Sequence, residues 1–325
     1  MISIGVVAPP DLPPADFIHY AQDAERLGFD QLWVVEDCFF RGGIAQAAVA
    51  LAQTRSLTVG CGILPAGARN PAFAALDIGT LAAMFPGRLV VGAGHGMPNW
   101  MRQTGSWPES PVTLLTEYIT ALKDLLAGRK VTTDGRYVRL SDVQLESPPV
   151  SAPPVLAGVR GPVSLRRTGA VADGVILAEP VTPEYLGAVR RITDPARVVA
   201  YNIGAIDESP ALARQRARQG LRMIGDPEWA PHIAPLPFAE EFAELRQEAA
   251  SREAFADALP DAWVDQLAVV GTARTAAERA HSLAAAGATD LVLIPAGDEP
   301  RACLPSLARI LPEIAHLRNE DPDTP

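Results

Sequence analysis

Two acidic residues directly follow a strand-like apolar run near the amino terminus. The run Gln31–Val35 leads straight into Glu36, Asp37 and Cys38. A carboxylate beside a buried segment costs free energy unless it is paired or does chemistry. Glu36 and Asp37 are therefore candidate catalytic or cofactor-contacting groups, and the alternative is a structural ion pair. Cys38 is a weaker candidate, because a lone cysteine is more often a small buried hydrophobic residue than a nucleophile.

A glycine-rich turn that contains one histidine follows another apolar run. Gly92, Gly94 and Gly96 alternate with Ala93 and His95. This G-x-G-x-G spacing departs from the G-x-G-x-x-G fingerprint of dinucleotide-binding folds, and no strand-end acid follows about twenty residues later. The missing side chains would let a flat ligand lie against the backbone, or they serve a tight turn. His95 either faces that ligand or fastens the loop with a hydrogen bond.

The turn Gly158–Gly161 has the composition of an anion site. Gly161 can cap a helix that begins at Pro162, and the free N–H groups at such a terminus bind anions. Arg160 adds positive charge, although an ordinary turn with solvated arginines is the alternative. A second turn, Ala172–Gly174, leads into the next strand, and we expect the two turns to be neighbours.

The elements that must position these groups alternate between strand-like and helix-like segments. Short apolar runs predict strands, and apolar stripes at helical spacing, bounded by glycine or proline, predict helices. Such alternation requires parallel strands with helical crossovers, and about eight units favour an α/β fold of the (β/α)8 TIM-barrel type over an open sheet. The expected strands cover residues 2–8, 31–35, 57–63, 89–93, 153–157, 175–177, 197–203 and 290–294.

We expect a single barrel domain over residues 1–317. Residues 130–140 predict an inserted hairpin, and residues 207–262 predict a helical insertion before the last strand. The remaining expectations are a capping box formed by Thr275 and Glu278, a closing helix over residues 304–317 and a polar tail over residues 318–325.

The bulk composition narrows the class of protein. The chain has 325 residues and a formal net charge of −10, which argues against a nucleic-acid or anionic membrane partner. Its three cysteines contain no C-x-x-C pair, and no two histidines have ligand spacing, so we expect no disulfide framework and no metal. The amino terminus lacks the composition of a signal peptide, and no apolar run is long enough to cross a bilayer. We therefore expect a cytoplasmic enzyme.

Several motifs together resemble the luciferase-like family of flavin- and deazaflavin-dependent oxidoreductases. The resemblance covers nearly the whole chain outside residues 207–262, and it rests on the order and spacing of the motifs. They are Ala24–Asp30, Trp33–Asp37, Gly62–Pro65, Arg69–Pro71, Pro86–Gly94, Ala172–Leu177, Val270–Thr272 and Gly287–Pro295.

The resemblance implies a barrel with a flavin or deazaflavin ring at the carboxyl ends of its strands. It also implies a non-proline cis peptide bond at Gly62–Ile63 behind the ring, and a cofactor phosphate near Gly158–Gly161 and Gly174–Ile176. The catalytic candidates are then Glu36, Asp37 and His95. The candidates for cofactor binding are Ala8, Gly62, Ile63, Leu64, Gly94, His95, Gly96, Ala157, Gly158, Val159, Arg160, Gly161, Gly174, Val175 and Ile176.

Two departures from the family pattern concern proton transfer. The family often has histidine after the aspartate that matches Asp37, and Cys38 stands there instead. Some sugar-phosphate dehydrogenase relatives carry a glutamate shortly after the strand-four glycines, and Met97–Gln103 contains no acid. The proton-transfer roles of the family therefore cannot be copied onto this chain.

The resemblance favours coenzyme F420-dependent hydride transfer to or from a small organic substrate. Phe39, Trp100, Met101 and Trp107 would line an apolar pocket, which indicates a fairly apolar substrate, or they would pack a dimer interface instead. One alternative is an FMN-dependent monooxygenase that uses O2 and reduced flavin from a separate reductase. Another is a non-catalytic flavin- or deazaflavin-binding protein. A sugar-phosphate lyase or isomerase is disfavoured because no lysine stands at a strand end. A homodimer is expected, since family members commonly form one.

Overall fold

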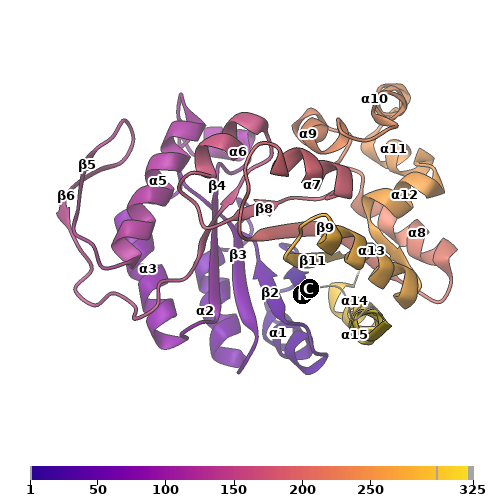
Figure 1. Cartoon of the computed structure of the whole chain (residues 1–325), viewed down its shortest axis with the longest axis horizontal. Helices are drawn as coiled ribbons and strands as arrows, with labels where there is room; N and C mark the ends of the chain where they lie inside the picture. Colours follow the sequence, from indigo (N-terminus) through magenta and orange to yellow (C-terminus); the bar gives the residue numbers. More distant parts are fainter. Residues whose placement is uncertain (1, 298, 321–325) are drawn as a thin grey trace.

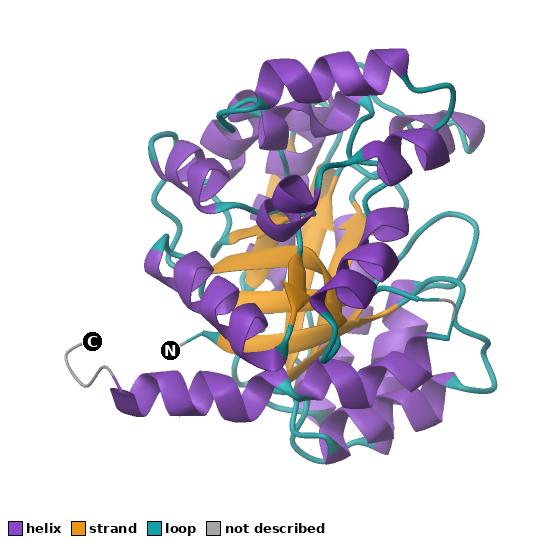
Figure 2. Cartoon of the chain, turned by 90° about the vertical axis from the view of Figure 1, so that its right-hand side faces the viewer, coloured by secondary structure: helices purple, strands orange, loops and turns teal. Residues whose placement is uncertain are grey.

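Parallel strands close into a barrel that helices surround on the outside (Figures 1 and 2). The computed structural model describes residues 2–297 and 299–320. β1 pairs with β2 on one side and with β11 on the other, and the pairing of β8 with β9 closes the ring. The barrel strands of this described part are β1 (Ser3–Ala8), β2 (Gln31–Val34), β3 (Thr58–Pro65), β4 (Leu89–Gly94), β7 (Val155–Gly158), β8 (Val175–Leu177), β9 (Val198–Ile206) and β11 (Asp290–Pro295). The predicted TIM-barrel fold is confirmed.

The crossover helices commonly begin at a proline, whose fixed φ suits the first helical turn and whose missing N–H is not needed there. None of the helices among residues 2–297 and 299–320 has the length and apolar character needed to span a membrane. The helices outside the insertion are α1 (Phe17–Arg26), α2 (Gly43–Gln53), α3 (Pro71–Met84), α4 (Pro98–Gln103), α5 (Pro111–Leu126), α6 (Pro162–Thr168), α7 (Pro183–Arg190), α13 (Ala273–Ala285), α14 (Pro300–Ala308) and α15 (Ile310–Glu320).

Two insertions extend from the barrel, and their elements run to Val143 and Leu267, past residues 140 and 262 at which the sequence placed their ends. The hairpin of β5 (Val131–Asp134) and β6 (Arg139–Val143) projects at the left edge of Figure 1. The helical insertion lies at the right of that view and ends in β10 (Val269–Gly271), which pairs with β9. Its helices are α8 (Pro210–Gly220), the 3-10 helix η1 (Pro227–Trp229), α9 (Ala230–Ile233), α10 (Ala239–Glu248), α11 (Arg252–Ala258) and α12 (Asp261–Leu267).

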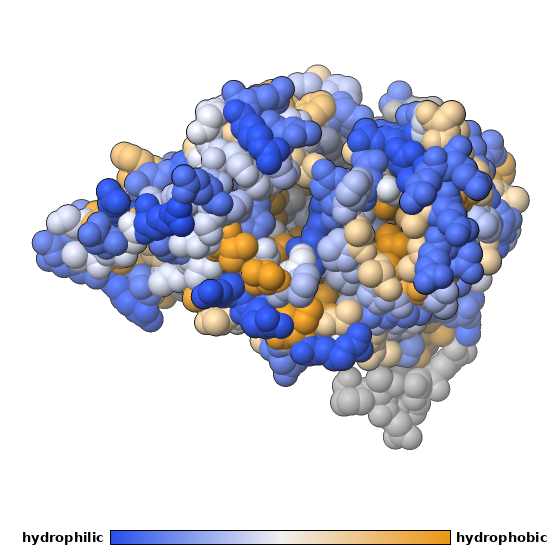
Figure 3. All heavy atoms as spheres, turned by 90° about the horizontal axis from the view of Figure 1, so that it is seen from above, coloured by the Kyte–Doolittle hydropathy of each residue, from blue (hydrophilic) through white to orange (hydrophobic). Residues whose placement is uncertain are grey.

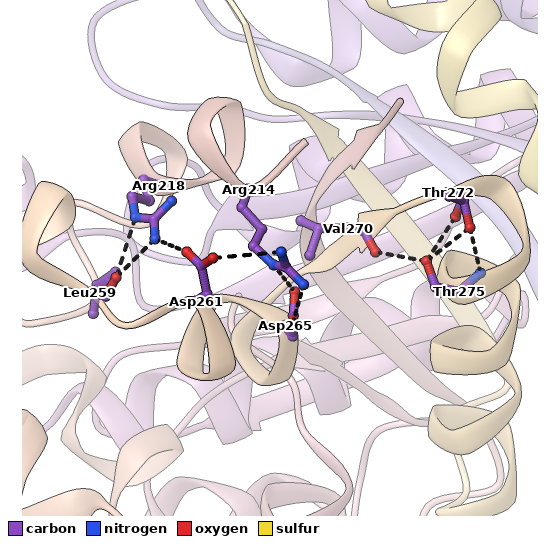
Figure 4. A network of polar contacts seen from close by, with 8 residues as sticks. All are labelled: Arg214, Arg218, Leu259, Asp261, Asp265, Val270, Thr272 and Thr275. Carbon is purple, nitrogen blue, oxygen red and sulfur yellow. Dashed lines mark hydrogen bonds and ion pairs between the residues drawn. The ribbon is translucent and has the colours of Figure 1, made fainter. Parts of the chain in front are cut away.

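Arginines of α8 fasten the two ends of this insertion together (Figure 4). Arg214 binds Asp265 of α12 through two nitrogens, at 2.7 and 2.8 Å. Arg218 donates to the carbonyl of Leu259 and pairs with Asp261 at the start of α12. The insertion is therefore tied back to its own first helix.

Three expectations about helix ends are corrected by the structure. The cap of α13 is Thr272, whose side chain accepts from the backbone N–H of Thr275, so the capping box at Thr275 and Glu278 is wrong (Figure 4). The closing helix is divided into α14 and α15. The last of these continues to Glu320, which makes the first part of the predicted polar tail helical, whereas residues 321–325 lie outside the described residues.

Large side chains fill the barrel interior and form its floor. Trp33 is fully buried, and its ring packs edge-on against Tyr201 at a centroid distance of 5.7 Å. Filled interiors of this kind are usual for eight-stranded parallel barrels. Any ligand must therefore bind above this layer, at the carboxyl ends of the strands. The layer consists of Val7, Trp33, Val90, Leu156, Ile176, Val199, Tyr201 and Val292.

Candidate active site

A bulge in β3 brings the backbone of Gly62 against the barrel floor. The register between β3 and β4 shifts between Cys61 and Leu64, and the Gly62–Ile63 peptide bond is cis, as the resemblance implies. A Cβ atom on Gly62 would lie 2.1 Å from the hydroxyl oxygen of Tyr201. Only glycine therefore fits there, and the hydroxyl of Tyr201 lies directly under the bulge.

The hydroxyl of Tyr201 is a buried donor without a hydrogen-bond partner among the described residues. The residue is only 5% exposed, and burial raises the pKa of Tyr201 well above its ordinary value. The group therefore stays protonated. An orphaned donor of this kind is costly in a folded chain, so it is a place where a bound molecule can supply the acceptor.

The glycines that surround the bulge have a packing role. A Cβ on Gly158 would lie 2.3 Å from the side chain of Ile63, and one on Gly94 would lie 2.9 Å from the carbonyl oxygen of Gly158. The space beside these two glycines is thus filled by Ile63 and by the next strand. They shape the bulge, and the surface for a flat ligand is the bulge itself.

Glu36 has a complete set of partners. Its carboxylate accepts from Nη2 of Arg69 at 2.8 and 2.9 Å and from the backbone N–H of Gly43 at 2.7 Å. The Glu36 side chain is 10% exposed and that of Arg69 is 26% exposed. Of the two interpretations of Glu36, this geometry favours the structural ion pair, which joins the β2 and β3 ends to α2.

Asp37 and Glu179 lie at the carboxyl ends of strands on opposite sides of the barrel. Asp37 follows β2 and Glu179 follows β8, and both are partly buried. Burial raises the pKa of Asp37. Burial also raises the pKa of Glu179, and the charge of Asp37 adds to that rise while Arg160 opposes it. Raised carboxyl pKa values at the carboxyl end of a barrel, where such folds bind their ligands, make both residues candidates for a functional role.

Glu179 is the residue that the sequence did not single out. It lies at the carboxyl end of a strand that was predicted at residues 175–177, yet one acid in that position gives no signal by itself. Neither Asp37 nor Glu179 forms an ion pair within 4.0 Å in the described ranges. That lack of a partner distinguishes both from Glu36.

His95 fastens the loop that follows β4. Its Nε2 atom lies 3.2 Å from the hydroxyl oxygen of Ser164 on α6. Burial lowers the pKa of His95, and the carbonyl of Pro111 partly offsets this effect. The contact matches the loop-fastening alternative for this residue. Gly96 follows in a left-handed turn, with a φ of 72°.

Arg160 is a partly buried cation that has no carboxylate partner. Its guanidinium stacks over the ring of Trp229 from the insertion, 4.3 Å from the ring centroid. Its backbone carbonyl accepts from the hydroxyl of Tyr185 at 2.9 Å, which fixes the turn. Among residues 2–297 and 299–320 it forms no ion pair within 4.0 Å. A positive charge oriented in this way can hold an anion.

The remaining candidates for cofactor binding divide between the two ends of the barrel. Ala8, Leu64, Ala157 and Val159 lie at or just beyond the carboxyl ends of their strands, whereas Ile176, the residue after Val175 on β8, belongs to the barrel floor and pairs with Gly158. Gly161 caps α6 and has open space around it.

Gly174 precedes β8, together with Asp173, which accepts from the backbone N–H of Val155 at the start of β7. The turn Ala172–Gly174 therefore lies at the amino-terminal end of the barrel, and the prediction that it adjoins Gly158–Gly161 is wrong. The reason is that a turn entering a parallel strand lies opposite to one leaving it.

The expected apolar lining is only partly brought together. Met101 is buried in the core of the loop, with its sulfur against Gly96, and Phe39 is 67% exposed at the rim. Trp107 lines a separate cleft of about 310 Å³ beside Arg69. No group of three or more histidine, cysteine, aspartate or glutamate side chains in the described residues is arranged to hold a metal ion.

Comparison with known proteins identifies the family. The family model described as luciferase-like monooxygenase matches residues 2–290, and the chain belongs to this family. It is 30% identical over 228 residues to a 5,10-methylenetetrahydromethanopterin reductase of Methanolobus tindarius, covering 67% of this chain and 69% of that protein. It is 32% identical over 183 residues to an F420-dependent glucose-6-phosphate dehydrogenase of Microbacterium testaceum, covering 53% and 54%.

Solved structures show the same fold. The coenzyme F420 dependent tetrahydromethanopterin reductase of Methanopyrus kandleri superposes with a TM-score of 0.80 at 20% identity, over 96% of this chain and 99% of that one. An F420-dependent secondary alcohol dehydrogenase in complex with an F420-acetone adduct gives 0.76 at 20% identity, with the same coverage. The chain is an oxidoreductase of the luciferase-like type.

Proposed function

We propose that this chain is a coenzyme F420-dependent oxidoreductase that transfers a hydride to or from a small, fairly apolar organic substrate. The observation that carries the proposal is a pair of polar groups, the guanidinium of Arg160, which has no carboxylate partner within 4.0 Å among the described residues, and the buried hydroxyl of Tyr201, which has no hydrogen-bond partner there. One suits an anionic group, and the other suits an acceptor beside the β3 bulge. The F420-dependent relatives support this choice of cofactor.

The residues present fit such a cofactor. Arg160, with the turn to Gly161, would hold its phosphate, and the bulge at Gly62–Ile63 would support its ring. When bound, F420 supplies or accepts a hydride at its deazaflavin ring. The protein then has to orient the substrate, exclude water and exchange a proton.

The apolar character of the substrate rests on the rim. Phe39 and Phe40, which follow Asp37 and Cys38, are 67% and 57% exposed. Adjacent exposed aromatic side chains commonly mark a binding surface. The face seen in Figure 3 is hydrophilic over much of its edge and has hydrophobic residues toward its middle.

An FMN-dependent monooxygenase, supplied with reduced flavin by a separate reductase, is the second candidate. A monooxygenase from Streptomyces bottropensis superposes with a TM-score of 0.73 at 17% identity, which shows that the same fold is found in a monooxygenase.

Parallel fluorescence titrations of the chain with F420 and with FMN separate the two candidates. We expect saturable F420 binding and weak or no FMN binding. Tight FMN binding without F420 binding would overturn the proposal.

A further inference from the structure

Glu179 belongs to a segment that is held unusually firmly for a loop. The side chain of Asn202 accepts from the backbone N–H of Val181 at 3.0 Å and donates to its carbonyl at 3.1 Å. The carbonyl of Pro180 lies 3.2 Å from Nδ1 of His232. Because these contacts fix the residues next to Glu179, its carboxyl group is positioned by the fold.

The strands on either side of Glu179 carry the other polar groups of the site. Glu179 follows β8, which pairs with β7, the strand that Arg160 follows, and with β9, the strand that carries Tyr201. The charges of Arg160 and Asp37 both act on the pKa of Glu179. Asn202 and Tyr201 are consecutive on β9 and point to opposite faces of it, so the segment of Glu179 is held from outside the barrel while the Tyr201 hydroxyl lies inside it against Gly62. Glu179 is therefore fixed at the carboxyl end of the strand between those of Arg160 and Tyr201, and it is partly exposed.

We propose that Glu179 is the group that exchanges a proton with the substrate, and that the substrate couple is accordingly a carbonyl and its alcohol or an imine and its amine. This inference rests on the proposed hydride transfer. A proton partner is needed at this site, because the positions where the family places histidine and glutamate hold Cys38 and the acid-free stretch Met97–Gln103.

The chemical step balances with a reduced deazaflavin as the two-electron donor. In the direction of reduction, a hydride from a C–H bond of the reduced deazaflavin, which breaks, forms a new C–H bond at the carbonyl or imine carbon. The π bond breaks, its electron pair moves to oxygen or nitrogen, and that atom takes the proton of Glu179. The substrate gains two electrons and the deazaflavin loses two. The Glu179 carboxylate, stabilised by Arg160, regains a proton from water at the mouth.

The raised pKa of Glu179 suits this role. Burial raises the pKa of Glu179 from the ordinary value of a glutamate. A general acid works best when its pKa lies near the working pH, so a shift in this direction favours the role. Asp37 contributes as a positioning residue, because its charge opposes ionisation of Glu179. The absence of an ion pair at Glu179 also means that its replacement by glutamine should not unfold the chain.

The test compares Glu179→Gln with Glu184→Gln, an exposed glutamate in the first turn of α7. We expect both variants to keep the wild-type melting temperature and F420 affinity. With reduced F420 and a panel of ketones, aldehydes and imines, kcat of Glu179→Gln should fall by about 100-fold or more. Carboxyl NMR of 13C-glutamate-labelled protein without cofactor should show one signal, absent from Glu179→Gln, that titrates above the other glutamates.

A third variant, Asp37→Asn, should move the high-pH fall in kcat to lower pH, whereas Glu179→Gln should remove that fall. A Glu179→Gln enzyme that keeps its rate within about 3-fold, a threshold far below the general-acid range, overturns the inference. An ordinary titration of the Glu179 signal, or no turnover of any panel member by a wild-type protein that binds F420, does the same. A wild-type protein that does not bind F420 refutes the proposed function itself.

Discussion

Replacing Glu36 with glutamine tests whether this acid is structural or catalytic. The change keeps the shape of the side chain but removes the charge that Arg69 and the backbone N–H of Gly43 contact. A hydrogen bond to a charged group contributes about 1 kcal/mol more than one between neutral groups. With two such partners, the expected loss is about 2 kcal/mol in the free energy of unfolding. The 10% exposure of the Glu36 side chain means that water replaces little of it.

The assay is urea unfolding at pH 7, followed by tryptophan fluorescence and compared through the transition midpoints. Glu109→Gln is the matched control, because Glu109 also pairs with an arginine, Arg136, but is 85% exposed. Its loss should stay below about 0.5 kcal/mol, as is usual for surface pairs. Glu36→Gln should retain F420 binding and the wild-type pH profile while folded. A variant of wild-type stability that loses turnover would refute the structural role and restore the catalytic one.

Three further predictions concern the anion site, a buried histidine and the assembly. Arg160→Gln should weaken F420 binding by about 10- to 100-fold, because one charge-assisted contact is lost. The control Arg167→Gln changes an exposed arginine of α6 and should leave F420 binding unchanged. Equal effects of the two substitutions would contradict the assignment of Arg160. Burial, and to a smaller extent the charge of Arg160, lower the pKa of His232 from 6.5 to about 3. Between these two pH values the unfolded chain binds more protons than the folded one, so the free energy of unfolding should fall as the pH drops from 6.5 toward 3. His232→Asn should flatten that fall in urea midpoints measured across pH, and an unchanged slope would contradict the assignment. Phe73 and Leu76 on α3 are 67% and 53% exposed, and we expect the homodimer interface to cover them. Light scattering should therefore show a dimer for the wild type and a monomer for the double variant Phe73→Glu with Leu76→Glu. A monomeric wild-type protein would contradict the expected homodimer.

The strands of the barrel could be predicted because each is a short apolar run that is buried on both faces. β8, only three residues long, was still found as the apolar run between Gly174 and Glu179. α7 was missed, although Thr182 and Pro183 carry a cap and first-turn signal like that of Ser110 and Pro111. The cap of α13 was misplaced because Thr272 and Thr275 are both residue types that cap helices. The sequence does not show that β10 ends at Gly271, which makes Thr272 the first residue available as a cap.

The site was less predictable because its meaning depends on distant partners. Glu36 and Asp37 are adjacent in sequence, but Arg69, 33 residues beyond Glu36, neutralises only the first. Glu179 becomes significant only when Asp37, Arg160 and Tyr201 are brought round the mouth by other strands. Such proximities arise from closure of the barrel and leave no local trace in the chain.

The most direct test of the account is a crystal structure of the wild-type protein with F420. The account predicts a deazaflavin ring against the Gly62–Ile63 bulge, its phosphate beside Arg160, and an acceptor within hydrogen-bond distance of the Tyr201 hydroxyl. A cofactor bound elsewhere, or one that leaves Arg160 and Tyr201 without contacts, would contradict it.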